Sequence, residues 1–321
     1  MALRKIYLFT ALVVLLVTLG AGTLRASRGT ESASFLDIPV GAGPAALGSA
    51  YSAQATDAYA PVYNPAGLAF LQEHQVAAQH LDYLESVHYE FLSGAYRLKE
   101  GRGLAVSAQY LGSGDITGRD LSGNPTGDYN ARYGAYSFAY GQTLLPALAV
   151  GVTGKVIQGK ISDVGSTAYA ADIGSLWKAR ENLQLAAVVT NIGSKLAFLN
   201  DDSSLPLAFH LGAAWRAQRF WTLSGEAVYP KTARAGARLG IDWHPTNLIS
   251  IRAGYRTDTT SNLGILAGFG TGLGLHLWGQ EFSYAWTPYG DLGDAQYFSF
   301  VFHFGAQNGP EGNLQPPENT P

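Results

Sequence analysis

Apolar and polar residues alternate along most of this chain, from about Gln75 to Phe304, in segments of about ten residues. The alternation is clearest in the last segment, where one face carries aromatic rings and the other face is more polar. The first face holds Phe298, Phe300, Phe302 and Phe304, and the second holds Tyr297, Ser299, Val301 and His303. A period of two residues is typical of a β-strand. A tilted strand of about ten residues is long enough to cross a bilayer.

Fourteen such segments are expected in this region. They cover residues 75–84, 88–98, 103–112, 129–141, 147–159, 167–178, 183–194, 206–216, 220–229, 232–243, 247–257, 263–271, 274–286 and 295–304. The pattern predicts an all-β fold, namely a transmembrane antiparallel up-and-down β-barrel of about fourteen strands. A soluble secreted β-sandwich is the alternative, because periodicity alone does not separate an apolar face buried in a core from one that faces lipid.

The lengths of the connections favour the barrel. Turns after even-numbered segments are short, for example at Glu100-Gly101, Leu145-Pro146 and Gly272, whereas several after odd-numbered segments are longer. The longer ones are Ser113–Asp128, Lys160–Ser166, Lys195–Leu205, Asp258–Asn262 and Thr287–Asp294. Outer-membrane barrels have short periplasmic turns and longer outer loops. We therefore expect the cell outer membrane as the location, outer-membrane lipid as the surroundings, and both chain ends on the periplasmic side.

The regions outside the barrel differ in composition. Arg4 and Lys5 precede an apolar run from Ile6 to Leu19, which predicts a secretory signal peptide over about residues 1–26. Residues 27–73 are rich in Gly, Ala and Pro and are expected to form an N-terminal plug, or hatch. Within it, Asn64 followed by Pro65 is typical of the start of a short helix. The barrel is expected over 74–305, and 306–321 is polar and Pro-rich, which predicts a disordered periplasmic tail.

Composition and charge narrow the possible functions. Only 14% of the 321 residues are charged, the net charge is -3, and there is no Cys. A nucleic-acid partner is not expected, because it needs a basic face, and thiol chemistry is excluded. The sequence contains no G-x-S-x-G and no H-E-x-x-H motif, so we expect neither an enzyme nor a cofactor. His80 and Asp82 share a strand face and could hold a metal weakly, but we favour a simple polar pair and expect no metal site.

Several charged residues are expected to face the lumen of the barrel from neighbouring strands. They are Glu226, Arg234, Arg238, Asp242, Arg252 and Arg256, and Lys155 and Asp172 are expected to do the same. Charges in a low-dielectric interior must pair or stay hydrated. One interpretation is a structural ladder that holds plug and barrel together. The other is a clamp for a ligand carboxylate, with Arg252 or Arg238 as the bidentate partner.

A series of short motifs resembles a known family. The series begins with Phe35-Leu36-Asp37-Ile38-Pro39-Val40-Gly41-Ala42-Gly43, continues through Ala46–Tyr51, Asp57-Ala58 and Asn64-Pro65-Ala66-Gly67-Leu68, and then includes Tyr110-Leu111-Gly112, Gly114-Asp115-Ile116, Asn191-Ile192-Gly193, Leu205-Pro206-Leu207 and Pro288–Asp294. In order and spacing they resemble the PorV/PorQ-type proteins of the FadL superfamily of outer-membrane barrels. The resemblance implies a fourteen-stranded barrel with a hatch, and it marks Asp57, Asn64, Pro65, Ala66 and Gly67 as the plug motif.

The resemblance also implies two functions. PorV-type relatives work with type IX secretion machinery, so we expect a secretion-associated or scaffold barrel that binds secretion components or cargo proteins. FadL-type relatives pass hydrophobic compounds such as long-chain fatty acids, so the alternative is a transporter of hydrophobic small molecules. One departure from the pattern is the segment after Phe304, because the last barrel strand usually ends the chain at an aromatic residue.

Overall fold

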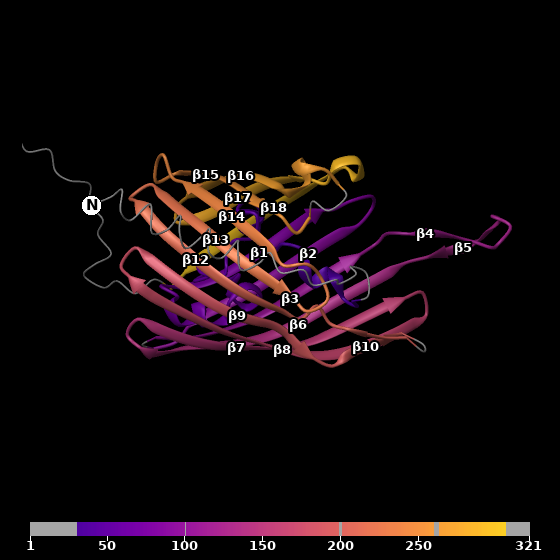
Figure 1. Ribbon diagram of the computed structural model, residues 1–321, viewed down its shortest axis with the longest axis horizontal. Helices are drawn as coiled ribbons and strands as arrows, with labels where there is room; N and C mark the ends of the chain where they lie inside the picture. The colour runs from indigo at the N-terminus through magenta and orange to yellow at the C-terminus, as the bar shows by residue number, and fades with distance from the viewer. Residues whose placement is uncertain (1–30, 100, 199–200, 260–262, 306–321) are drawn as a thin grey trace, which may run out of the picture.

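The computed structural model describes residues 31–99, 101–198, 201–259 and 263–305, and it contains a closed antiparallel barrel (Figure 1). Fourteen strands close it in the order β1-β18-β17-β16-β15-β14-β13-β12-β9-β8-β7-β6-β3-β2, and every pair is antiparallel. The predicted fold is therefore confirmed. The predicted signal peptide and the tail at 306–321 lie outside the described residues.

The barrel strands agree with most of the predicted segments to within a few residues. Their bounds are β1 His74–Asp82, β2 His88–Arg97, β3 Arg102–Gly112, β6 Ala131–Leu145, β7 Leu148–Ile161, β8 Val164–Arg180, β9 Leu183–Gly193, β12 Ala208–Gln218, β13 Trp221–Pro230, β14 Gly236–Trp243, β15 Ile249–Arg256, β16 Phe269–Leu277, β17 Gln280–Pro288 and β18 Asp294–Phe304. Two extra hairpins lie in the loops, β4 Ile116–Arg119 with β5 Pro125–Tyr129, and β10 Lys195–Phe198 with β11 Asp201–Ser204.

Large apolar side chains cover the outside of the barrel. Phe138 on β6 is 57% exposed, Leu273 on β16 is 56% exposed, and Phe298 on β18 is 46% exposed, while the alternate positions are buried. Closure pairs the backbone groups of each strand with those of its neighbours, so no open edge faces lipid. No helix among the described residues is long and apolar enough to span a membrane. The apolar outer surface therefore belongs in a bilayer, as the alternation predicted.

The connections separate the barrel into a short-turn end and a long-loop end, as predicted. β4 and β5 form an arm that extends well beyond the long-loop end (Figure 1). The predicted loop Lys160–Ser166 is wrong, because β7 and β8 pair up to Ile161 and Val164 and leave a two-residue turn. The twelfth turn, predicted at Gly272, is also wrong, since β16 continues to Leu277. The turn lies at Trp278-Gly279, where both residues have positive φ, as a tight hairpin requires.

The described part of the N-terminal segment, from Glu31 onward, fills the lumen as a plug. It consists of short helices joined by turns, namely η1 Ser34–Asp37, α2 Ala42–Ala46, α3 Ala60–Tyr63 and η2 Pro65–Phe70. The predicted helix start is confirmed, because Asn64 caps η2 by accepting a hydrogen bond from the Ala66 N–H at 3.1 Å, and Pro65 occupies the first turn. The helix it caps is a 3-10 helix.

Glycines on the inner wall bring the plug into direct contact with the strands. We call them the glycine floor. Gly103, Gly141, Gly151 and Gly174 lie against Asn64–Phe70, and Gly240, Gly254, Gly270 and Gly272 lie against α2 and the turn that follows it. A Cβ atom at any of these eight positions would overlap plug atoms or force them to move. Gly272 resembled a turn signal in the sequence because a strand glycine can equally mark a close approach of two backbones.

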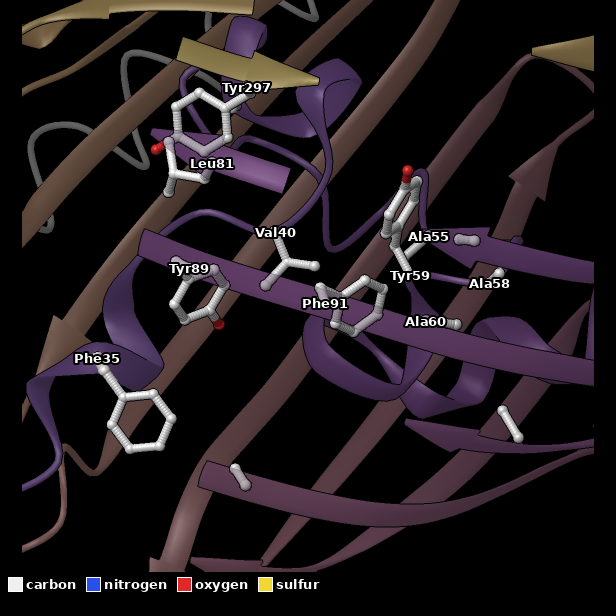
Figure 2. Packing of buried hydrophobic residues seen from close by; sticks show 14 of the residues in the cluster. Phe35, Val40, Ala55, Ala58, Tyr59, Ala60, Leu81, Tyr89, Phe91 and Tyr297 are labelled. Atoms are coloured by element: carbon white, nitrogen blue, oxygen red, sulfur yellow. The ribbon is translucent and has the colours of Figure 1, made fainter. Parts of the chain in front are cut away.

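Apolar and aromatic side chains complete the contact between plug and wall (Figure 2). Val40 and Tyr59 of the plug lie beside Tyr89 and Phe91 of β2. The rings of Tyr59 and Phe91 stack with their centroids 5.8 Å apart. The core of the protein therefore lies inside the barrel, between plug and strands, while the outer surface is left to lipid.

Candidate functional site

A cavity of about 540 Å³ opens inside the barrel at the long-loop end. Its apolar lining is contributed by the plug, by the β1–β2 connection, by β3 and β6, and by the β10–β11 hairpin. The lining residues are Phe35, Ile38, Tyr83, Val87, Leu111, Tyr133, Leu196 and Phe198. Tyr133 lies at the centre of an aromatic row, with its ring centroid 5.6 Å from Phe35 and 6.4 Å from Phe198. We call this space the aromatic cavity.

One side of the aromatic cavity is polar and is held in place by the backbone. Glu31, Ser32, Ser34 and Ser203 line this side. The N–H of Ser32 donates to the carbonyl of Ser204 at 3.0 Å, and its hydroxyl donates to the carbonyl of Ser203 at 2.9 Å. The first described residues of the plug are therefore tied to β11 at the mouth of the barrel. A volume of several hundred Å³, lined by aromatic and aliphatic side chains on one side and by polar groups on the other, can hold a small organic molecule.

The plug closes the aromatic cavity on its inner side. Ile38 lines both this cavity and a second one of about 60 Å³ deeper in the barrel. Lys155, His210, Glu226 and Arg238 contribute charged or ionisable groups to the wall of the deeper cavity. The segment around Ile38 thus separates the aromatic cavity from the ionisable groups deeper in the barrel. A molecule in the aromatic cavity cannot continue along the lumen unless this part of the plug moves.

The plug motif predicted from the sequence lies at the contact with β8. Asn64, Pro65, Ala66 and Gly67 are all buried. The Asn64 amide donates to the carbonyl of Ser52 at 2.9 Å and to that of Ser175 on β8 at 3.1 Å. Gly67 packs directly against the carbonyl of Ala55, where a side chain has no room. These residues hold the segments of the plug together and attach the plug to β8. Their contacts therefore support a structural role.

Asp57, the remaining residue of the motif, accepts hydrogen bonds inside the plug. Its carboxylate receives the Tyr51 hydroxyl and the Tyr59 N–H, the latter at 2.9 Å. Burial raises the pKa of Asp57 to about 6, although the hydrogen bonds from Tyr51 and Tyr59 act in the opposite direction. Asp57 therefore changes charge within a range of pH where an ordinary aspartate is already ionised.

The predicted lumen charges form two ion-pair clusters. In the first, Glu226 pairs with Arg238 at 3.5 Å and with His210 at 2.9 Å, and its second oxygen accepts the Ser52 N–H of the plug at 2.9 Å. Arg238 also donates to Asp258 at 3.0 Å. Arg256 binds the same Asp258 through two nitrogens, at 2.6 and 2.7 Å. The first cluster therefore joins the wall to the plug.

The second cluster is centred on Arg252, which is 8% exposed. Its guanidinium donates to Asp242 at 3.2 Å, to Glu281 at 2.8 Å and to the Ser283 hydroxyl at 3.0 Å. Carboxylates of the protein thus already bind Arg238 and Arg252. This geometry supports the structural ladder over the ligand clamp, because a ligand carboxylate would have to displace an internal one.

Arg234 does not join either cluster. It is exposed in the connection between β13 and β14, because β13 ends at Pro230 and pairing resumes only at Gly236. Proline lacks the N–H that a strand in the middle of a sheet needs, which explains why β13 ends at Pro230, close to its predicted end. The predicted strand 232–243 is therefore shorter at its start, and Arg234 lies outside the lumen-facing face.

A third buried polar group spans the neighbouring strands β7, β8 and β9. Lys155 on β7 forms an ion pair with Asp172 at 2.6 Å, and both side chains are at most 5% exposed. Asn191 completes the group: its amide oxygen accepts from Lys155 at 2.9 Å, and its backbone N–H donates to Asp172 at 2.7 Å. Asn191 has a φ of 60°, and the β8–β9 register shifts beside it. The Asn191-Ile192-Gly193 motif therefore marks a β-bulge whose polar groups are satisfied internally.

Sequence reasoning missed three members of the clusters and most of the aromatic cavity. His210, Asp258 and Glu281 take part in four of the six ion pairs described for the two clusters. Of the three, only Asp258, two residues after Arg256, could have been found from its position in the sequence. The cavity residues come from six separate segments, so no local pattern brings them together. Phe35 and Ile38 are the exceptions, because they belong to the first motif of the resemblance.

The outer face of the barrel carries a second hollow, an apolar groove of about 930 Å³. It runs across the outside of eight neighbouring strands, β15–β18, β1–β3 and β6, through side chains such as Leu92, Tyr110, Leu273, Phe282 and Phe298. His80 and Glu90 lie at its edge. Because this face is turned to lipid, the groove is in contact with acyl chains.

Comparisons with known proteins identify solved structures with a similar fold. No family model matches the sequence, and no curated protein matches it. Solved structures do match. The CymD monoaromatic hydrocarbon channel superimposes with a TM-score of 0.61 at 12% identity, over 83% of this chain and 98% of that one. The Pseudomonas putida toluene transporter TodX gives 0.59 at 12% identity, over 82% and 96%. A Pseudomonas aeruginosa FadL homologue gives 0.55 at 11% identity, over 82% and 98%.

These similarities show that the chain has the fold of a FadL-like outer-membrane barrel. The match extends over nearly the whole of each relative, and it agrees with the fourteen strands and the apolar outer surface. The part of the predicted resemblance that concerns the FadL superfamily is therefore supported at the level of fold. The narrower PorV/PorQ-type assignment gains no support from any of these neighbours.

Proposed function

We propose that this outer-membrane barrel is a FadL-like transporter that admits hydrophobic small molecules. The observation that carries the proposal is the aromatic cavity, which lies at the long-loop end and is lined by Phe35, Tyr133 and Phe198. Transport needs no catalytic group. It needs a binding cavity and a plug that closes the lumen, and the plug and the barrel wall supply both. This was the alternative function in the sequence analysis, and the fold neighbours favour it over the secretion hypothesis.

The polarity of the aromatic cavity indicates the kind of solute. Burial of an apolar molecule against these rings is favourable by about 25 cal/mol per Å² of apolar surface removed from water. The serines at the opposite side can bond one polar group of the same molecule. We therefore propose a compact, mainly apolar solute, such as the monoaromatic hydrocarbons named for the structural neighbours or the hydrocarbon end of a fatty acid.

Uptake by cells that contain or lack the protein tests the proposal. Radiolabelled toluene and a labelled long-chain fatty acid serve as solutes. The host is a Gram-negative strain from which its own FadL-like transporters have been deleted. We expect the protein to raise uptake of at least one of them severalfold. Equal uptake of both solutes with and without the protein would rule the proposal out.

A pair of tryptophan variants separates the cavity from the rest of the barrel. Val87→Trp fills the aromatic cavity, because Val87 lines it. Val106→Trp adds the same ring on the outer face, where Val106 is 55% exposed. We expect Val87→Trp to reduce uptake by about ten-fold, the factor that corresponds to 1.4 kcal/mol of lost binding, and Val106→Trp to leave it unchanged. Equal effects of the two variants would contradict a role of the cavity.

The arm formed by β4 and β5 favours a second candidate function, the secretion-associated or scaffold role. It projects beyond the barrel (Figure 1). Leu121, in the turn between its two strands, is fully exposed. An exposed hairpin with an apolar tip is a suitable surface for a protein partner. Recovery of secretion components or cargo with the intact protein, and their loss when residues 116–129 are replaced by a short turn, would support this function.

A further inference from the structure

Two histidines and two carboxylates converge on the outer face of the β1–β2 hairpin. His80 lies directly opposite Glu90, and Asp82 lies directly opposite His88. All four side chains point away from the lumen and are 47% to 57% exposed. The sequence alone indicated only His80 and Asp82, because the register that adds His88 and Glu90 is visible only once the strands are paired. We call these four residues the outer quartet.

The distances in the outer quartet match those between ligands of one metal ion. The Asp82 Oδ1 atom lies 3.4 Å from His80 Nε2 and 3.4 Å from His88 Nδ1. Ligands about 2.0–2.1 Å from a tetrahedral Zn²⁺ are separated from one another by about 3.4 Å. Among the described residues, His80, Asp82 and His88 form a group whose ligand atoms all lie within 4.8 Å of one another. Small side-chain rotations are enough to bring the three atoms around one cation.

Glu90 prepares His80 for this task. Its Oε1 atom lies 2.6 Å from His80 Nδ1, so a neutral His80 donates its proton there and keeps the lone pair of Nε2 free. The Nε2 atom of His80 lies 3.4 Å from the Asp82 carboxylate, so a cation between them, either a proton on His80 or a metal ion in its place, satisfies both groups. A carboxylate that holds the far nitrogen of a ligating histidine is the usual support of protein zinc sites.

We propose that the outer quartet binds a divalent transition-metal ion of the Zn²⁺ class, with His80 Nε2, Asp82 Oδ1 and His88 Nδ1 as ligands and Glu90 as the positioning residue for His80. Imidazole nitrogen favours such ions over Ca²⁺ or Mg²⁺, which prefer oxygen ligands. The high exposure of the group leaves a fourth position open to water or to an oxygen ligand from outside. The proposal does not depend on the transport function.

The position of the outer quartet means that a bound ion would restrain the connection between β1 and β2. Asp82 and His88 flank the connection 83–87, whose Tyr83 and Val87 line the aromatic cavity. An ion that holds Asp82 to His88 closes this connection at its base. Hydrogen exchange of the backbone at 83–87 is therefore expected to slow down when the ion binds.

Calorimetric titration of the full-length protein in detergent tests the proposal. The protein carries no polyhistidine tag, because such a tag would itself bind Zn²⁺. We expect one equivalent of Zn²⁺ to bind saturably and Ca²⁺ to bind at least ten-fold more weakly. His88→Gln should weaken Zn²⁺ binding at least ten-fold, and Glu90→Gln should weaken it about 10- to 100-fold, as expected for loss of a supporting carboxylate. X-ray absorption of the zinc-loaded protein should show imidazole scattering from two histidines.

His303→Gln is the matched control, because His303 is also paired with a single carboxylate, Glu73, at 2.8 Å, but no third ligand lies beside it among the described residues. This variant should bind Zn²⁺ as the wild type does. Because the outer quartet is exposed, its variants should keep the β-sheet circular dichroism of the wild type. Absence of saturable Zn²⁺ binding to the wild type, or unchanged binding to His80→Gln/His88→Gln, would overturn the proposal.

Discussion

At the scale of single residues, several charged groups inside the barrel pair with one another, and the clearest case is Lys155 with Asp172. Both side chains are almost fully buried, and Asn191 binds each of them. Removal of one charge leaves the other without compensation, which typically costs 3–5 kcal/mol, whereas replacement of both by apolar residues costs much less. The sequence indicated that these two residues face inward, but their partner Asn191 depends on a bulge that no alternation pattern reveals.

Lys155→Met is therefore expected to destabilise the barrel by about 3–5 kcal/mol. The midpoint of urea unfolding in lipid vesicles measures this effect. The double variant Lys155→Met/Asp172→Leu should recover most of the loss. A double variant as unstable as the single one would show that the charge of Asp172 is not the cause.

Asp57 predicts a pH dependence at the same scale. Its pKa of about 6 in the folded protein lies above the usual value of 3.8. The folded protein therefore holds this proton more tightly than the unfolded chain does. The stability that this group contributes is complete below about pH 4 and is lost as the pH rises through about 6. We expect the difference in urea midpoint between wild type and Asp57→Asn to change between pH 4 and pH 7 and to remain constant above pH 7. A constant difference throughout would contradict the assignment.

At the scale of elements, the strands were predictable because their period reflects lipid on one side and protein on the other. Alternation located Phe298 to Phe304 on the outer face and the arginines of β14 and β15 on the inner face without reference to any partner. Two of the errors arose at or near a glycine and a proline. Gly272 belongs to the glycine floor and is not a turn, and after Pro230 the next strand pairs only from Gly236 and not from the predicted residue 232. The aromatic cavity was not predictable, since it depends on how the plug is seated.

The glycine floor gives a matched pair of variants on one strand. Gly151 on β7 lies against Pro65 and Ala66 of the plug, whereas Gly154 on the same strand has open space around its Cβ position. Gly151→Val should displace η2 from the wall, while Gly154→Val should have little effect. Limited proteolysis of the plug in the folded barrel distinguishes them. Equal resistance to protease in the two variants would mean that the plug tolerates a side chain at Gly151.

At the scale of the whole molecule, the plug is the part that fills the lumen of the barrel. Fourteen strands enclose more space than barrels of about eight strands, whose interior side chains fill the lumen, and approach the porins, which leave an aqueous channel. Here the plug occupies that space and is held by ion pairs, hydrogen bonds and the glycine floor. The fold followed from the sequence, whereas the choice between transport and secretion did not.

Deletion of residues 31–73 is expected to produce an open pore. In planar bilayers the wild-type protein should show little ion conductance, and the deletion variant should show stable conductance steps. Circular dichroism should confirm that the deletion variant still forms a barrel. A folded deletion variant without conductance would mean that the loops at the long-loop end also close the lumen.

The arm formed by β4 and β5 has a practical consequence. It leaves the barrel at the long-loop end, and its two strands pair only with each other. It turns at Ser122-Gly123, where both residues are exposed. Loop tips of this kind accept inserted sequences with little thermodynamic cost. A foreign epitope inserted at this turn should therefore be displayed on intact cells and bind antibody there, which would make the protein a carrier for surface presentation and would also reveal which end of the barrel faces the medium.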